Sequence, residues 1–238
     1  MENKIQLQPA YVLFSRPFQN TSLMLDFFTI DYGRIRAIAR GARRHSSKYR
    51  SFLQPFHPLL IGYTGRGEVK TLGHVESSVA AITLKGERLF SAIYLNEILC
   101  RLLHNYVEHK SLYKNYQEAL IALQGSGNLE VTLRIFELTL LSELGYAINF
   151  NEVHLTNEPI IKGKLYKFSP YIGFELASPI DDEENPQNYF EGEVLIAIKE
   201  LKLEEGKVSK SAKRLLRIAL SSLLGDKPLN SRNLFAPL

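Results

Sequence analysis

The 238-residue chain contains a single cysteine, Cys100. One thiol cannot build a disulfide framework, and it excludes any zinc site that needs several thiolates. A reducing, cytoplasmic setting is therefore expected. The chain also lacks an uncharged apolar run of about 18 residues, the length needed to cross a bilayer. Its first residues do not have the basic-then-apolar pattern of a secretory signal, so no membrane partner is predicted.

Sequence motifs that carry catalysis are missing as well. The chain has no Gly-x-x-x-x-Gly-Lys-Ser/Thr phosphate loop and no Gly-x-Ser-x-Gly nucleophile elbow. Its six histidines include no i, i+4 pair of the kind that holds zinc on a helix. Cys100 lies in an apolar helical stripe, where a buried, inert thiol is expected. We therefore predict a binding protein that is not an enzyme and that needs no cofactor.

The formal net charge is only +4, but the positive charge is concentrated in the first third of the chain. Residues 1–80 carry eleven Lys or Arg against five Asp or Glu, whereas residues 81–150 and 151–238 each have a net charge of −1. Seven cations fall within seventeen residues that contain no acid: Arg34, Arg36, Arg40, Arg43, Arg44, Lys48 and Arg50. Such a density costs stability through repulsion unless the side chains are solvated or meet an anion. A solvated basic loop is the simplest interpretation.

The start of this cluster has the two-residue period of a β-strand. Within residues 34–40 the odd positions are small or apolar, and Arg34, Arg36 and Arg40 occupy even positions. The alternation therefore predicts three guanidinium groups on one face of a sheet. The next segment, 41–51, is small, polar and basic, which favours a mobile arm. A basic sheet face continued by a basic arm suits a phosphate backbone.

Short strands separated by turn residues dominate the first 80 residues, with expected strands at 11–15, 22–30, 34–41, 56–63 and 68–76. They predict a small closed barrel of the OB type, with an SH3-like barrel as a near equivalent. Helical periodicity follows at 89–104, 112–123 and 129–144, and returns at 192–203 and 209–224. The predicted fold class is α+β, in four segments. These are an OB-fold nucleic-acid-binding domain (1–80), a helical domain (81–150), an irregular region (151–192) and C-terminal helices packed on the helical domain (193–238).

The last predicted helix, 209–224, carries a second basic face. Four of its cations follow the three-to-four spacing of a single helix face: Lys210, Lys213, Arg214 and Arg217. Near the first cluster, Tyr49 and Phe52 are candidates for stacking on bases, although core packing is the favoured role for Phe52.

Three other functions are compatible with these sequence features. An RNA-binding OB protein with a helical dimer module would have the same charge pattern. A metal-dependent nuclease could hold Mg²⁺ with the acidic run Asp181–Glu184. Those carboxylates lie in one segment and do not converge from different elements, which favours a solvated loop. The third alternative is a scaffold without affinity for nucleic acid.

Segments along nearly the whole chain, in order, resemble the RecO family of recombination mediators. In the first third they are Tyr11–Pro17, Thr21–Asp26, Gly33–Arg34, Ala39–Arg43, Leu53–Phe56 and Gly65–Leu72. Later in the chain they are Tyr94–Leu99, Arg134–Leu138, Leu144–Tyr146 and Lys227–Phe235. No single motif is diagnostic, but the ordered set is highly specific.

The resemblance implies a DNA repair and recombination protein of the bacterial cytoplasm, associated with the nucleoid. Such proteins bind single- and double-stranded DNA and anneal complementary strands. With RecR they help load the RecA recombinase on DNA coated with single-stranded DNA-binding protein. The residues predicted to bind DNA are Arg34, Arg36, Arg40, Arg43, Arg44, Lys48, Arg50, Arg66, Lys70, Lys210, Lys213, Arg214 and Arg217.

The resemblance also implies a role for Arg134, which matches a family arginine associated with the C-terminal tail of single-stranded DNA-binding protein. A guanidinium beside an apolar helix groove suits that acidic, Phe-ending ligand. In one respect the chain departs from the family. Many members have four zinc-binding cysteines after the helical domain, and residues 151–190 contain none, so the resemblance implies a zinc-ribbon-like region at 151–192 without its cysteines. Zinc is therefore not expected, and packing should replace it, through Tyr166, Phe168, Tyr171, Ile172 and Phe174.

Overall fold

The computed structural model describes residues 4–47, 49, 51–77, 79–177 and 186–235. The chain divides into two compact units. The first comprises Met1–Ser126 together with Pro228–Leu238, and the second comprises Gly127–Lys227. Among the described residues, no helix has both the length and the apolar character required for a membrane span.

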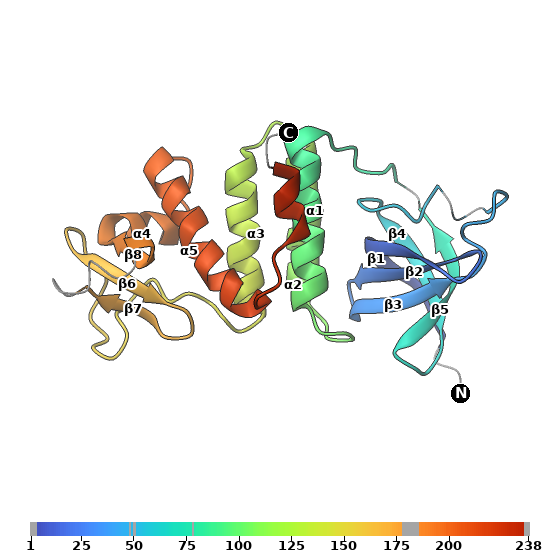
Figure 1. Cartoon of the computed structure of the whole chain (residues 1–238), viewed down its shortest axis with the longest axis horizontal. Coiled ribbons are helices and arrows are strands. Elements are labelled where there is room, and N and C mark those ends of the chain that lie inside the picture. Colours follow the sequence, from blue (N-terminus) through green and yellow to red (C-terminus); the bar gives the residue numbers. More distant parts are fainter. Residues whose placement is uncertain (1–3, 48, 50, 78, 178–185, 236–238) are drawn as a thin grey trace. The chain divides into compact units, whose positions relative to one another are not determined.

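The first unit begins with a closed five-stranded barrel (Figure 1). Its strands are β1 (Lys4–Phe18), β2 (Ser22–Thr29), β3 (Gly33–Ala39), β4 (Leu59–Thr64) and β5 (Val69–Glu76). They close in the order β1-β2-β3-β5-β4, with β3 and β5 parallel and the other pairs antiparallel. This arrangement is OB-like, so the predicted barrel and the α+β class are confirmed.

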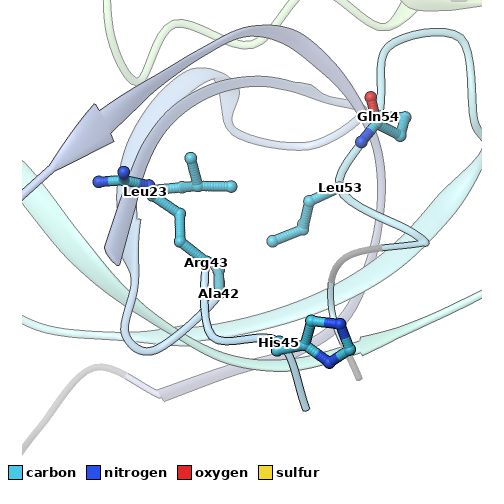
Figure 2. Close-up of a pocket in the computed structure, with 6 residues that line it drawn as sticks. All are labelled: Leu23, Ala42, Arg43, His45, Leu53 and Gln54. Carbon is cyan, nitrogen blue, oxygen red and sulfur yellow. The ribbon is translucent and has the colours of Figure 1, made fainter. Parts of the chain in front are cut away.

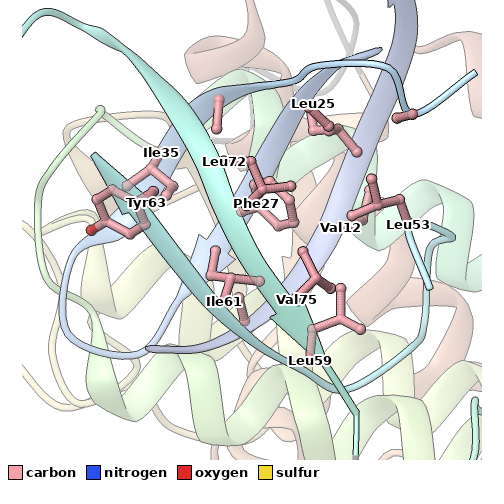
Figure 3. Packing of buried hydrophobic residues seen from close by; sticks show 14 residues of the cluster. Val12, Leu25, Phe27, Ile35, Leu53, Leu59, Ile61, Tyr63, Leu72 and Val75 are labelled. Carbon is pink, nitrogen blue, oxygen red and sulfur yellow. The ribbon is translucent and has the colours of Figure 1, made fainter. Parts of the chain in front are cut away.

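Alternating burial along the strands fills the barrel. On β3 the side chains of Ile35, Ala37 and Ala39 are buried, and the residues between them are partly exposed. Figure 3 shows Ile35 with Phe27, Ile61 and other apolar side chains inside the barrel. The predicted alternation of β3 is therefore confirmed. Burial of this apolar surface is the main stabilising contribution to such a small barrel.

Two helices, α1 (Gly86–Leu102) and α2 (Lys110–Gln124), complete the main part of the first unit. A bulge in β1 between Val12 and Phe14 interrupts its register with β2. The buried Asn96 of α1 donates from Nδ2 to the Leu13 carbonyl at 3.0 Å and accepts at Oδ1 from the Tyr116 hydroxyl of α2 at 2.5 Å. One amide therefore satisfies a buried carbonyl at the bulge and links both helices to the barrel.

The C-terminal segment returns to this unit as the short 3₁₀ helix η3 (Asn230–Phe235). The Glu97 carboxylate of α1 accepts hydrogen bonds from the backbone N–H groups of Asn230 and Ser231, each at 2.8 Å, and from the Ser231 hydroxyl at 2.6 Å. A carboxylate at the first turn of a helix satisfies N–H groups that lack intrahelical partners. Glu97 therefore fastens η3 to α1.

The second unit combines three helices with a small sheet: α3 (Leu129–Glu143), α4 (Gly192–Lys199) and α5 (Gly206–Leu224), and strands β6 (Leu165–Ser169), β7 (Gly173–Leu176) and β8 (Tyr189–Glu191). The 3₁₀ helix η2 (Pro186–Asn188) precedes β8. The strands pair in the order β7-β6-β8, so the region predicted as irregular contains an ordered sheet. Tyr166, Phe168 and Phe174 are buried, as predicted, but Tyr171 and Ile172 are exposed, because they form the β6–β7 turn.

Candidate nucleic-acid interface

Two of the predicted arginines face an internal carboxylate. Asp26 of β2 lies opposite Arg36 of β3, and its Oδ1 accepts from Arg36 Nε at 3.0 Å and from Arg34 Nη2 at 3.3 Å. Arg34 also donates to the carbonyl oxygens of Cys100 and Leu103 at the end of α1. The side chains of Asp26, Arg34 and Arg36 are 9%, 15% and 33% exposed. Alternation placed Arg34 and Arg36 on one face correctly, but that face is not an open basic surface.

The segment after β3 holds cations of a different kind. Arg40, Arg43 and Arg44 are exposed, and no carboxylate of the described residues lies within ion-pair distance of them. The prediction of a mobile arm over 41–51 stays a prediction; of its residues, 41–43 and 45–46 form turns. The Arg43 N–H donates to the Thr21 carbonyl at 2.8 Å, and the Arg44 N–H donates to the Gly41 carbonyl at 3.1 Å. We call residues 40–47 the basic loop.

Arg43 connects the basic loop to the β1–β2 turn. Its Nη1 lies 3.3 Å from the Gln19 carbonyl and 3.5 Å from the Asn20 carbonyl. In OB folds the β1–β2 and β4–β5 turns border the surface that binds oligonucleotides. The basic loop therefore lies beside one of the two turns that frame this surface.

Two predicted cations lie at the β4–β5 connection, Arg66 in the turn and Lys70 in the first residues of β5. Arg66 is exposed. The Lys70 ammonium donates to the Gly65 carbonyl at 3.1 Å and lies 4.8 Å from the centre of the Tyr106 ring. Lys70 is therefore partly engaged within the first unit. Two further predicted residues, Lys48 and Arg50, lie outside the described residues.

The basic face of α5, in the second unit, is only partly open. Lys213 pairs with Glu130 at 3.3 Å. Arg214 donates to the Tyr189 carbonyl at 2.7 Å and lies 4.4 Å from the Phe190 ring centre, and burial lowers its pKa. Lys210 and Arg217 are exposed, and no carboxylate in the described part of the chain pairs with them.

Arg134 is buried on α3 and paired along its own helix. Its Nε lies 2.9 Å from Oε2 of Glu137, and its Nη2 donates to Oε1 at 3.0 Å. The guanidinium therefore has a two-point partner within the second unit. Binding of the C-terminal tail of single-stranded DNA-binding protein by Arg134 stays a prediction. It requires that the tail reach a guanidinium that is largely buried.

Several other predicted residues have structural roles. Tyr49 donates from its hydroxyl to the Gly73 carbonyl at 2.9 Å, and both Tyr49 and Phe52 pack against the barrel core. The favoured core role of Phe52 is confirmed. The acidic run Asp181–Glu184 lies outside the described residues, and the residues that are described contain no cluster of three His, Cys, Asp or Glu side chains placed to hold a metal.

Sequence reasoning missed the role of Asp26. It is the only acid between Glu2 and Asp31, and it lies in a segment correctly predicted as a strand. A lone carboxylate in a strand that precedes an arginine-rich strand is a signal for an internal pair. The net charge summed over a whole region does not reveal this pair, because a single acid changes that sum very little.

Comparison with known proteins identifies the family. The family model "Recombination protein O N terminal" matches residues 1–79, and "Recombination protein O C terminal" matches residues 84–233. The chain is 42% identical over 229 residues to proteins named DNA repair protein RecO from Salmonella dublin and from Yersinia enterocolitica serotype O:8 / biotype 1B. Each match covers 96% of this chain and 93% of the relative. The chain therefore belongs to the RecO family of DNA repair and recombination proteins.

Proposed function

We propose that this protein binds single- and double-stranded DNA and anneals complementary strands, without making or breaking a covalent bond. The observation that carries the proposal is the basic loop. Its arginines Arg40, Arg43 and Arg44 are exposed, have no carboxylate partner among the described residues, and lie beside the β1–β2 turn. Contacts of this type neutralise phosphates and carry no sequence information, so binding independent of sequence is expected.

Annealing follows from the same charges. Two complementary strands repel each other through their phosphates, and a cationic surface that holds both strands lowers the repulsion and raises their local concentration. The proposed function needs neither ATP nor a bound metal. We further propose that it takes place in the cytoplasm and serves to load the RecA recombinase on DNA coated with single-stranded DNA-binding protein, together with RecR.

The roles of the predicted residues differ in this proposal. Arg40, Arg43, Arg44 and Arg66 provide the main phosphate contacts, with Arg36 and Lys70 at their edge. Arg34 stabilises the first unit through Asp26 and the end of α1. On α5, the exposed Lys210 and Arg217 form a separate candidate contact.

The test is a triple substitution of Arg40, Arg43 and Arg44 by alanine. Because log K for a single strand changes with log salt by about −0.7 per phosphate contact, losing three contacts should reduce the slope by about 2. Fluorescence anisotropy of a labelled oligonucleotide over a salt series measures this slope. A matched triple on α5, Lys210→Ala, Lys213→Ala and Arg217→Ala, is the control. If the slope of log K against log salt is unchanged in the basic-loop variant but reduced in the α5 variant, the DNA-binding site lies on α5.

A strand-annealing assay tests the rest of the proposal. Complementary strands coated with the cognate single-stranded DNA-binding protein should anneal faster with the wild type than with the basic-loop variant. Equal rates for the two proteins would contradict the link between the basic loop and annealing.

A further inference from the structure

A cavity of about 310 Å³ opens between the basic loop and the barrel. Its lining residues are Leu23, Ala42, Arg43, His45, Leu53 and Gln54. They come from the start of β2, from the basic loop and from the segment that follows it. Figure 2 shows Leu23 and Leu53 extending into this space from opposite sides, with His45 on the side of the basic loop.

The cavity has an apolar floor that the barrel holds in place. Ala42 and Leu53 are each only 2% exposed and belong to the barrel core, against which Leu23 also packs. The backbone bond from Arg43 to Thr21 fixes the basic loop beside Leu23. The floor is therefore formed in the free protein and does not depend on a ligand to assemble it.

The rim of the cavity is polar and cationic. Arg43, His45 and Gln54 are exposed around it, and the exposed Arg40 and Arg44 lie within three residues of Arg43 in the chain. A nucleotide has the complementary chemistry, because a flat base with weakly polar faces is joined to an anionic phosphate. Proteins that hold an unstacked base place it between aromatic or apolar side chains, and proteins that bind single strands hold the backbone with cations.

We propose that this cavity receives one unstacked base of a DNA single strand, with the adjacent phosphate held by Arg43 and His45. This inference rests on the proposed function, since it presupposes that the basic loop binds DNA. Bases within a duplex are paired and stacked, and taking one out costs a few kcal/mol. The cavity therefore distinguishes a single strand from a duplex. When two strands pair, the base leaves the cavity, and the annealed product is bound less tightly than its separate strands.

The first test uses the wild-type protein with two oligonucleotides of equal length and charge. One is an ordinary single strand, and the other has abasic sites throughout its central half. Stacking of a base on an aromatic side chain is worth roughly 1–3 kcal/mol, and the aliphatic floor of this cavity should give the lower end of that range, so the abasic strand should bind about fivefold weaker. Equal affinities would overturn the inference and leave the proposed function intact. No binding of either strand would overturn both.

The second test places a reporter at the rim. Because the chain contains no tryptophan, Gln54→Trp introduces a single one beside the cavity. An ordinary single strand should quench its fluorescence, and the abasic strand should not. Phe14→Trp is the matched control, since Phe14 is 53% exposed on β1 and does not line the cavity. Equal quenching of the two tryptophans, or none at Gln54→Trp with a bound ordinary strand, would contradict the assignment.

A third variant, Ala42→Leu, narrows the cavity. It should weaken binding of a single strand about fivefold more than binding of a duplex, because only the single strand places a base in the cavity. Equal weakening for both ligands, or for neither, would refute the inference. The abasic comparison needs no substitution, so it stays decisive if this variant does not fold.

Discussion

The buried charges around Asp26 give a sharp prediction for stability. Replacing Asp26 by asparagine keeps the shape of the side chain but removes the negative charge that faces Arg34 and Arg36. At about 3 Å and an effective dielectric constant near 20, each attraction is worth roughly 5 kcal/mol before the cost of desolvation is subtracted. Removing one member of a buried ion pair costs about 3–5 kcal/mol in measured cases. Arg36 is a third exposed, so water replaces part of the lost interaction.

We therefore expect Asp26→Asn to lower the free energy of unfolding by about 3 kcal/mol, the lower end of that range. For a chain of this size the melting temperature should fall by about 6–12 °C. Urea denaturation followed by circular dichroism measures the change. Arg40→Gln is the matched control, because Arg40 is an exposed arginine that follows β3, and its loss should change stability by less than about 0.5 kcal/mol.

An Asp26→Asn variant as stable as the wild type would show that this ion pair does not stabilise the barrel. Equal loss of stability in the Arg40→Gln control would lead to the same conclusion. A double-mutant cycle that combines Asp26→Asn with Arg36→Gln measures the contribution of Arg36 separately from that of Arg34. The double variant should be less destabilised than the sum of the single variants, because the second substitution removes a charge that the first leaves without a partner.

Two further predictions concern other carboxylates. The double variant Arg134→Gln and Glu137→Gln removes a buried pair without leaving a lone charge, so it should fold but lose affinity for an acidic, Phe-ending peptide, as measured by anisotropy. Unchanged peptide affinity would contradict the role of Arg134, and naked-DNA binding serves as the control. For Glu97, burial raises the pKa, but hydrogen bonds from Ser231 and Asn230 outweigh burial and lower it overall. Because the folded-state pKa lies below the usual 4.5, the stability that Glu97 contributes should be complete above pH 4.5 and should be lost as the pH falls below that value. Thermal unfolding of the wild type and of Glu97→Gln over a pH series tests this, and a difference that does not change with pH would contradict it.

The fold was largely predictable because its determinants are local. The two-residue period of β3 and the three-to-four spacing of the helices arise because each element buries one face. This pattern is visible within the sequence of each segment and needs no knowledge of distant residues. Most strands and helices therefore lie within a few residues of their predicted bounds, but β1 runs over Lys4–Phe18 and is much longer than the predicted 11–15. The sheet in the second unit was harder to predict, because β6, β7 and β8 have only three to five residues each and are separated by glycine, proline and acidic segments.

The candidate site was less predictable, because its charges depend on pairing across strands. The hairpin that joins β2 to β3 turns at Ile30–Tyr32, and its register places Asp26 opposite Arg36. That pairing could have been inferred from the short turn, since turn length fixes hairpin register. The contact of Arg34 with the Leu103 carbonyl could not, because it joins residues 69 positions apart.

A cluster of cations in the sequence is therefore not a map of a binding surface. Arg34 and Arg36 share a short acid-free segment with Arg40, Arg43 and Arg44, yet an acid from the preceding strand compensates the first two. The arginines within the strand have fixed neighbours on β2, whereas Arg40, Arg43 and Arg44 lie beyond Ala39, the last residue of β3 that pairs with β2. A partner of opposite charge can be supplied by the fold only where another element lies close enough. For this reason Arg40, Arg43 and Arg44 stay exposed where β3 ends, and a polyanion is expected to bind mainly there, with Arg36 at the edge of the contact.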